Sequence, residues 1–370
     1  MNNIDVTEID VTSINETSIN GTSTAAENTA DKDTDNTGKN ATGEKMCAAV
    51  PLISVVIPTY GRESVLCETI KSVLAQTYAA FEVIVVDQTK VHEAATQAFL
   101  TQMAELGKIQ LHTVEWASLP AARNYAIERS HGDIFLFLDD DVELPEGCLA
   151  AHAKGFENRP EVGAIAGRVF DRMKLSESTK PLIETLPPEA MDPGIAWYHI
   201  DLVHTTKPQR VLTARGCNMS FRREIFEQHG LRFDERFQGS AVREESDFCL
   251  RVRRTGLIIW YEPDAHLVHL GEETGGCHDI STRSLKYQTT FYHNHFLMAL
   301  KNLTPSQLLR LSSSLFDCHV LGNPPCNKGG GPVKIASRFG FYVLGFLQAC
   351  WTLIKPGNRD GRLYSEPVSM

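Results

Sequence analysis

Several signatures of other protein classes are missing from this sequence of 370 residues. It has no basic stripe, and its formal net charge is −10, which argues against a nucleic-acid surface. Its nine cysteines are odd in number and scattered, without a C-x-x-C pair, so they signal neither a disulfide framework nor a zinc site. This cysteine usage fits a reducing, cytoplasmic setting. Apolar and charged fractions of 42% and 22% are close to globular averages and allow a proper core.

The first 48 residues lack aromatic side chains and carry few aliphatic ones. They have neither the basic start nor the apolar centre of a signal peptide. A stretch this rich in Thr, Asn, Asp and Ser cannot bury enough apolar surface to offset the entropy of ordering. We therefore expect a disordered polar tail over residues 1–48, a main domain over 49–303 and a helical extension over 304–370.

Strand and helix patterns alternate from residue 52 onward. Short β-branched runs predict strands, and apolar residues at helical spacing predict the helices between them. The expected strands are 52–57, 81–86 and 109–114, and the expected helices are 62–76, 94–106 and 119–129. Such regular alternation predicts an α/β fold with a doubly wound, mostly parallel sheet flanked by helices.

A run of five apolar residues, Ile134 to Leu138, ends in Asp139, Asp140 and Asp141. An unbroken apolar run is typical of a strand buried on both faces, and open α/β sheets bind ligands at the carboxyl ends of such strands. Alternation points Asp139 and Asp141 the same way, so both can face one Mg²⁺ or Mn²⁺ that also binds a diphosphate. An acidic turn that caps the next helix is the alternative.

Other residues are weaker candidates for a ligand site when each is considered alone. Asp87 follows the strand at 81–86 and is either a turn former or a ligand. Arg123 belongs to a predicted helix, where a surface position is the plainer interpretation. Residues 171–210 lose regular patterning, which is typical of a lid or binding loop. Gly216 either permits close approach of the backbone to a ligand or makes a bulge.

The late segment 243–254 predicts a helix with Glu244, Glu245 and Asp247 in its first turns. Stabilisation of the helix dipole explains these acids without any chemistry. In the strand that follows, His266 and His269 fall on opposite faces, so only one can look into a cleft and complete a metal site.

The C-terminal part reads as helices over 281–303 and 306–315, followed by an apolar stretch at 339–354. Basic residues flank that stretch, which is shorter than the roughly 20 residues needed to span a bilayer. An interfacial or re-entrant helix is our interpretation, and a plain buried helix is the alternative.

Four motifs occur together in one order: SVVIPTYGR, VIVVDQT, LPAARNYAI with GDIFLFLDDDV, and REESDFCLRVRRTG. Over about residues 52–300 the chain resembles the inverting family 2 glycosyltransferases, which have the GT-A fold. Two departures stand out. Asp87-Gln88-Thr89 replaces the frequent Asp-Asp-Gly-Ser, and Glu244-Glu245 replaces the usual Glu-Asp.

The resemblance implies roles for individual residues. Asp87 would bind the nucleotide base, Asp139 or Asp140 the ribose, and Asp141 the metal, with His269 as the carboxy-terminal metal ligand. The wider nucleotide-sugar site would comprise Pro58, Thr59, Tyr60, Arg62, Asp87, Arg123, Asp139, Asp140 and Gly216. Metal ligands would be Asp141, Asp139 and His269, and candidates for the general base are Glu245, Glu244 and Asp247.

The expected function is therefore metal-dependent transfer of a sugar, with inversion, from a nucleotide-sugar donor to a hydroxyl of a saccharide or lipid-linked acceptor. Mg²⁺ or Mn²⁺ is the expected cofactor, and no nucleic acid is expected as a partner. The expected location is cytoplasmic, with peripheral contact at the inner face of the membrane. Two alternatives are a sugar nucleotidyltransferase, which would want an early glycine and lysine rich loop, and a non-catalytic membrane-associated sugar-binding protein.

Overall fold

The computed structural model describes residues 50–172, 184–186, 191–194, 205–272, 274–276, 284–324, 326 and 328–355. These residues belong to one compact unit that runs from Val50 to Met370. The predicted polar tail and most of the excursion at 171–210 lie outside the described residues. The predicted boundary near residue 304 stays a prediction.

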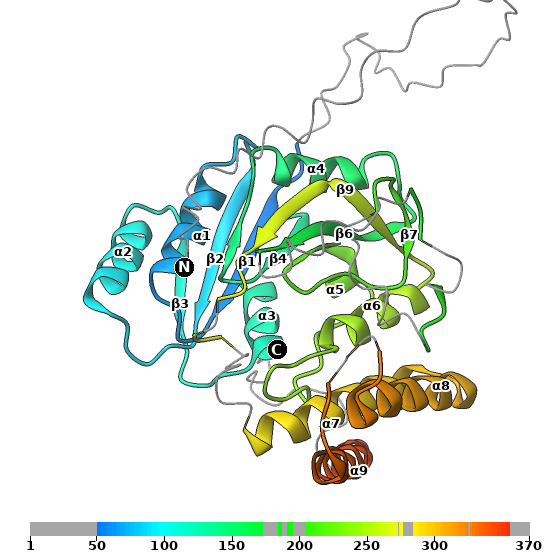
Figure 1. Cartoon of the computed structure of the whole chain (residues 1–370). Helices are drawn as coiled ribbons and strands as arrows, with labels where there is room; N and C mark the ends of the chain where they lie inside the picture. The colour runs from blue at the N-terminus through cyan, green and yellow to red at the C-terminus, as the bar shows by residue number, and fades with distance from the viewer. Residues whose placement is uncertain are drawn as a thin grey trace, which may run out of the picture. The chain divides into compact units, whose positions relative to one another are not determined.

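A twisted sheet forms the centre of the described chain (Figure 1). Its strands are β1 (Ile53–Thr59), β2 (Phe81–Asp87), β3 (Gln110–Thr113), β4 (Ile134–Leu138), β5 (Val142–Glu143), β6 (Val162–Asp171), β7 (Gln209–Val211), β8 (Asn218–Arg222) and β9 (Ile258–His269). The order across the sheet is β3-β2-β1-β4-β8-β6-β9-β5, and β7 pairs with β9. Strands β1, β2, β3, β4, β6 and β9 run in one direction, whereas β5, β7 and β8 run in the other. The expected α/β class with a mostly parallel sheet is confirmed.

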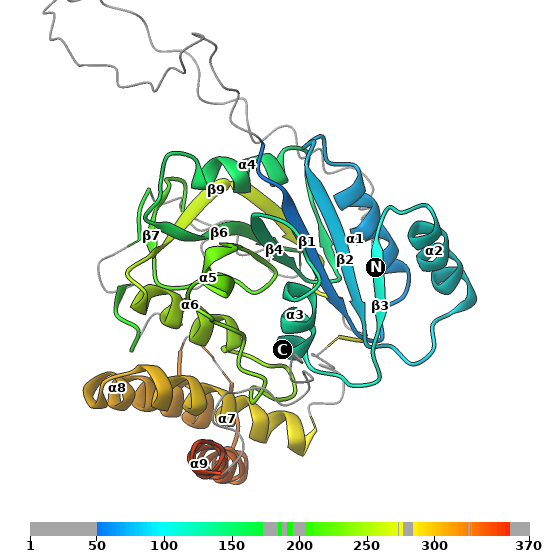
Figure 2. The ribbon, with the colours of Figure 1, turned by 180° about the vertical axis from the view of Figure 1, so that it is seen from behind.

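Helices cover both faces of this sheet (Figure 2). They are α1 (Ser64–Leu74), α2 (Ala94–Glu105), α3 (Leu119–Ile127), α4 (Cys148–Phe156), α5 (Glu224–Glu227) and α6 (Glu244–Arg254). One core cluster joins the sheet to α1, α2 and α4, and a second joins it to α3, α5 and α6. Alternate side chains of β4 face opposite sides of the sheet, so Ile134, Leu136 and Leu138 belong to the first cluster and Phe135 and Phe137 to the second.

Strand β9 contains an irregularity that matters for the site. Gly167 of β6 pairs with Glu262, but the next residue, Arg168, pairs with His266, so β9 bulges between these partners. The Asn218 side-chain amide donates to the carbonyls of Ala265 (2.9 Å) and Arg168 (3.0 Å) and so holds the bulge. A Cβ at Gly167 would lie 2.2 Å from that amide nitrogen. Glycine at this position is therefore what lets Asn218 reach across.

The C-terminal elements form a helical layer beside α6 (Figure 1). It consists of α7 (Leu285–Asn302), α8 (Pro305–Leu315), a π-helical turn η5 (Phe316–Leu321) and α9 (Pro332–Ile354). A capping box of Thr304 and Gln307 starts α8. Gly345 lets α9 press against α7, since a Cβ there would lie 2.5 Å from the Tyr292 Cβ.

Two expectations need correction in this layer. Cys318 and Cys326 form a disulfide, because the chain reverses at Gly322 (φ 83°) and brings two cysteines of unremarkable spacing together. The last helix starts at Pro332 rather than near Phe339, since Pro332 occupies its first turn, where proline is tolerated. Within the described part of the chain, no helix is both long and apolar enough to cross a membrane.

Candidate active site at the carboxyl edge of the sheet

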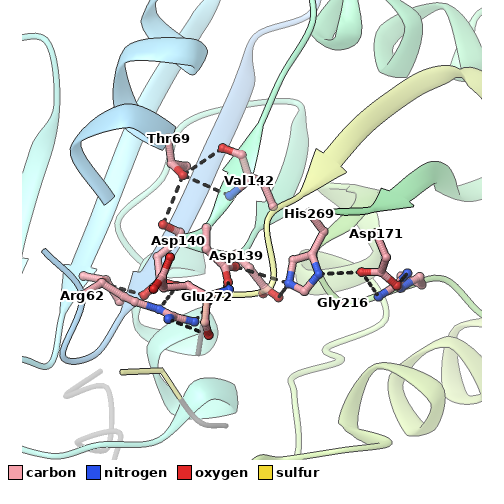
Figure 3. A network of polar contacts seen from close by, with 12 residues as sticks. Arg62, Thr69, Asp139, Asp140, Val142, Asp171, Gly216, His269 and Glu272 are labelled. Carbon is pink, nitrogen blue, oxygen red and sulfur yellow. Dashed lines mark hydrogen bonds and ion pairs between the residues drawn. The ribbon is translucent and has the colours of Figure 1, made fainter. Parts of the chain in front are cut away.

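The acidic triplet emerges from the end of β4 next to the ends of β1 and β2. Figure 3 shows His269 beside Asp139 and Asp171. The His269 Nε2 lies 3.3 Å from Asp141 Oδ1 and 4.0 Å from Asp139 Oδ2. Pairing of Val142 with His269 across β5 and β9 brings the histidine there. One ligand atom each from Asp139, Asp141 and His269 lies within 4.8 Å of the others. Two carboxylates and one imidazole are a donor set that could hold a divalent metal ion.

His269 is held from behind by Asp171, a residue that the sequence reasoning missed. The His269 Nδ1 lies 2.8 Å from Asp171 Oδ1, and Arg215 donates to the same carboxylate at 2.8 and 3.3 Å. Parallel pairing of Asp171 with His269 sets up this contact. An acid at the end of a neighbouring strand was the available signal. A carboxylate behind a ligand histidine fixes the ring orientation and favours metal binding.

His269, Asp141 and Asp171 shift one another's pKa values. Burial alone would lower the pKa of His269, but Asp141 and Asp171 outweigh it and raise the pKa to about 10. Burial would raise the pKa values of Asp141 and Asp171, yet their contacts with His269, together with Arg62 and Arg215 respectively, lower both. Without a metal, the ring is therefore cationic at neutral pH. A metal ion that binds its Nε2 must displace a proton.

Asp140 turns the other way, as strand alternation predicts. Its carboxylate accepts hydrogen bonds from Thr59 Oγ1 (2.8 Å) and Arg62 Nε (3.2 Å), and more weakly from the Tyr60 N–H (3.4 Å). Burial raises the pKa of Asp140 to about 7, because Arg62 offsets only part of that cost and Asp141 adds like charge. Asp140 thus ties the loop after β1 to the end of β4.

Arg62 links this loop to the segment after β9. Its Nη2 lies 3.1 Å from Asp141 Oδ2, and its Nη1 donates to the carbonyls of Glu272 (3.1 Å) and Thr274. The backbone N–H of Glu272 also donates to Asp141 Oδ2, at 3.0 Å. Glu272 and Thr274 therefore lie close to Arg62 and to the cluster of Asp139, Asp141 and His269.

Asp87 occupies the same edge, at the end of β2. Its Oδ1 accepts from the Thr89 N–H (2.9 Å), and its Oδ2 lies 3.0 Å from His92 Nε2. Gln88 connects two segments of the chain. Its side-chain nitrogen donates to the Thr59 carbonyl (3.2 Å), and its side-chain oxygen accepts from the Ser118 N–H (2.6 Å). Gln88, one of the residues at which this chain differs from the frequent Asp-Asp-Gly-Ser motif, thus joins β1 to the start of α3.

The three acids of α6 have different surroundings. Glu244 is buried in an ion pair with Arg123, which also donates to the Gly216 carbonyl (3.0 Å) and approaches Asp139 to 3.9 Å. The half-buried Glu245 accepts a hydrogen bond from Ser246 Oγ (2.9 Å). Asp247 is fully buried against Lys301 (2.7 Å) and Arg251 (2.9 Å). Arg123 is therefore no surface residue, and Asp247 has the partners of a structural carboxylate.

Comparison with known proteins agrees with this geometry. Residues 54–230 match the sequence profile of Glycosyl transferase family 2. The O-antigen biosynthesis protein RfbC of Myxococcus xanthus is 28% identical over 229 residues, which cover 59% of this chain and 17% of that protein. The glucosyl-dolichyl phosphate glucuronosyltransferase of Haloferax volcanii is 27% identical over 234 residues, which cover 59% of this chain and 68% of that protein.

A solved structure shares the fold. The S. aureus TarS 1-349 structure in complex with UDP-GlcNAc has a TM-score of 0.55 at 17% identity, and the match covers 80% of this chain and 81% of TarS 1-349. The sheet and the helices on its two faces thus have the GT-A fold. The resemblance to the family 2 glycosyltransferases is thus confirmed for a domain that includes residues 54–230.

Proposed function

We propose that this chain transfers a sugar, with inversion, from a nucleotide-sugar donor to a hydroxyl of a saccharide or lipid-linked acceptor, and that the reaction depends on Mg²⁺ or Mn²⁺. The observation that carries the proposal is the meeting of Asp139, Asp141 and His269 at the carboxyl edge of the sheet. RfbC and the Haloferax glucuronosyltransferase, whose names place them in glycan synthesis, support a saccharide or lipid-linked acceptor.

Asp139, Asp141 and His269 are the residues that hold the metal in this proposal, and Asp171 orients the histidine. A bound divalent cation would neutralise the charge that develops on the departing nucleoside diphosphate. The donor lies along the strand ends, where Asp87 receives the base and the loop Pro58–Arg62 borders the ribose with Asp140. Arg123 and the Gly216 backbone border its sugar end, since they lie between Asp139 and Glu244.

Glu245 is our choice for the general base. It is half-buried and accepts one hydrogen bond, from Ser246, so its carboxylate can take a proton from an acceptor hydroxyl. Glu244 instead fixes Arg123 beside Asp139, and Asp247 fixes α7 through Lys301. Attack on the anomeric carbon from the face opposite the diphosphate inverts configuration without a covalent intermediate.

A donor-binding assay tests the metal site first. The melting temperature of the purified protein is measured against a panel of nucleotide sugars, with Mn²⁺ or with EDTA. We expect one donor to stabilise the protein in Mn²⁺ only, since a ligand raises stability by binding the folded state. Asp141→Asn should abolish this shift, because it removes one anionic metal ligand. Glu143→Gln, at an exposed position two residues away, should keep it. Equal donor binding by Asp141→Asn, or by wild type in EDTA, would contradict the proposal.

We also propose that α9 lies on the inner face of the membrane. Its outward surface carries Phe339, Leu344, Leu347, Trp351 and Ile354, of which Leu347, Trp351 and Ile354 are 57%, 60% and 70% exposed. The helix contains no acidic residue, and the exposed Lys334 and Lys355 stand near its two ends. An apolar face with basic ends complements an anionic bilayer surface.

A further inference from the structure

A histidine in the loop between β2 and α2 faces two carboxylates. The Nε2 of His92 lies 3.0 Å from Asp87 Oδ2, and its Nδ1 lies 3.3 Å from Glu63 Oε1. Only 2% of the His92 side chain is exposed. Both carboxylates are acceptors, so the ring donates to one of them when neutral and to both when cationic. The shorter contact, to Asp87, favours a proton on Nε2.

Glu63 holds the other side of this ring. Its Oε2 accepts the Glu93 N–H at 3.1 Å, so one carboxylate contacts both the ring and the backbone just before α2. Burial would raise the pKa of Glu63, but its contacts with Thr96, Glu93 and His92 outweigh burial and lower it. Glu63 is therefore anionic at neutral pH and suits a ring N–H donor. The orientation of His92 is thus fixed by groups of the protein itself.

The two oxygens of Asp87 each have one partner from the chain. Oδ1 accepts the Thr89 N–H at 2.9 Å, and Oδ2 faces His92 Nε2. The Asp87 side chain is 5% exposed, so an approaching group meets an edge of the carboxylate rather than the whole of it. An ionised carboxylate has about four acceptor positions, so Asp87 can accept a further N–H. A carboxylate that is already oriented binds a ligand with less loss of side-chain freedom.

The strand order sets the distance between Asp87 and the metal ligands. Asp87 pairs with Thr59 of β1, and Thr59 Oγ1 donates to Asp140 at 2.8 Å, next to Asp141. From β2 across β1 to β4 there are two strand spacings, which amount to about 10 Å. A nucleoside diphosphate spans a gap of this kind between its diphosphate and the edge of its base.

We propose that His92 is a positioning residue for nucleotide recognition. With Glu63 behind it, His92 holds the Asp87 carboxylate in the orientation that accepts an N–H of the donor's base. This role rests on the proposed function, in which Asp87 receives the base. Because His92 acts at the base end of the donor, its loss should raise the KM for the donor and leave kcat nearly unchanged.

Two amides of different length test the contact with Asp87. The side-chain nitrogen of His92→Gln can take the place of Nε2, whereas that of His92→Asn reaches only the place of Nδ1. Isothermal titration measures binding of UDP, GDP, CDP and ADP to the full-length protein in Mn²⁺. The nucleotide that wild type binds should bind His92→Asn about tenfold more weakly, because a hydrogen bond to a charged group is lost. His92→Gln should stay within about threefold of wild type.

His131→Asn is the matched control. The His131 Nδ1 lies 3.3 Å from Oε2 of Glu82, at the other end of β2, and the His131 side chain is 76% exposed. The same replacement there should leave nucleotide binding unchanged. A loss as large as that of His92→Asn would mean that β2 transmits any such change, and it would overturn the proposal.

A double substitution shows whether His92 acts through Asp87. Asp87→Ala should itself weaken the nucleotide, and His92→Asn in that protein should cause no further loss, because the carboxylate that His92 orients is gone. A further loss of about tenfold in that background overturns the proposal. Equal losses in His92→Gln and His92→Asn overturn it as well, and so does a lowered kcat with an unchanged KM. If His92→Asn does not fold, His92→Leu replaces it in every comparison.

The same titrations separate this inference from the proposed function. A nucleotide that binds wild type and His92→Asn equally would refute the role of His92 and leave the transferase standing. If wild type binds none of the four nucleotides in Mn²⁺, the proposed function is refuted, and the role of His92 is refuted with it.

Discussion

The sheet region and the helical layer distribute apolar and polar side chains in opposite ways. Strand β4 buries all five of its apolar residues and then presents three acids at its end. The helical layer buries polar residues of α7, among them His293, Asn294 and His295, while α9 buries only Gly345 and Ala349 among the side chains described for it. Ile335, Phe341 and Leu353 of α9 pack against the core of the helical layer, but many of its other apolar side chains lie outside that core. In the sheet, apolar residues stabilise the fold and the acids form the proposed ligand site, whereas in α9 many apolar residues are exposed and form the surface that we propose for membrane contact.

The largest effect we expect concerns chemistry, and it belongs to the sheet side. Glu245→Gln should lower donor turnover by roughly 10² to 10⁴, the usual contribution of a general base. Leu347→Ala, on the outer face of α9, should leave turnover unchanged. Turnover is measured as release of nucleoside diphosphate from the donor that the thermal-shift panel identifies.

The base assignment has its own control. Asp247→Asn should reduce stability more than turnover per folded molecule, because Asp247 is buried against Lys301 and Arg251. If Asp247→Asn abolishes turnover in a folded protein while Glu245→Gln stays active, then Asp247 is the base.

Core packing should show the same contrast in stability. Phe137→Ala removes a fully buried ring that packs on Phe221, Phe226 and Phe233, and it should lower the free energy of unfolding by about 3–5 kcal/mol. Leu347→Ala truncates a side chain that is 57% exposed and should cost less than about 0.5 kcal/mol. Urea denaturation measures both. A comparable loss for Leu347→Ala would mean that α9 is packed against another surface of this protein in solution.

An ion-pair cluster connects the two regions and should give a pH-dependent effect. Burial alone would raise the pKa of Asp234, but Arg236 and Lys301 of α7 lower it to about 2. Since the ordinary value is 3.8, this stabilisation is present above pH 3.8 and is lost as the pH falls toward 2. Asp234→Asn should therefore cost about 2 kcal/mol at pH 7 and progressively less below pH 4. Denaturation at a series of pH values tests this. A cost that does not change with pH would show that the charge of Asp234 is not what stabilises.

The smallest effect on stability is expected for α9, where the substitutions should instead change membrane binding. Trp351→Ser with Leu347→Ser should abolish flotation with anionic liposomes without lowering the melting temperature. Val91→Ser, at a residue that is 83% exposed on the sheet side, should float as wild type does. Wild-type protein that stays at the bottom of the gradient would rule out the membrane assignment of α9.

The sheet and the acidic residues at the end of β4 could be predicted from local sequence pattern. Buried parallel strands give unbroken apolar runs, and strand alternation alone separates Asp140 from Asp139 and Asp141. What could not be predicted depends on contacts between distant segments. The carboxylate of Asp171 behind His269 follows from β6–β9 pairing, and the burial of Arg123 follows from its ion pair with Glu244 across 121 residues. The disulfide likewise depends on how the chain turns at Gly322, which spacing between cysteines does not encode.

The position of His269 depends on the number of residues in the β9 bulge rather than on which residues these are. Where β6 advances by one residue, from Gly167 to Arg168, β9 advances from Glu262 to His266, which changes the phase of every later side chain. If one of residues 263–265 were removed and the bulge kept its size, the later residues of β9 would shift by one position, and a neighbour of His269 would face Asp139 and Asp141. Such a deletion would move the histidine out of the site while every residue assigned to the site remained in the sequence, whereas a bulge that shortens would keep the histidine in place.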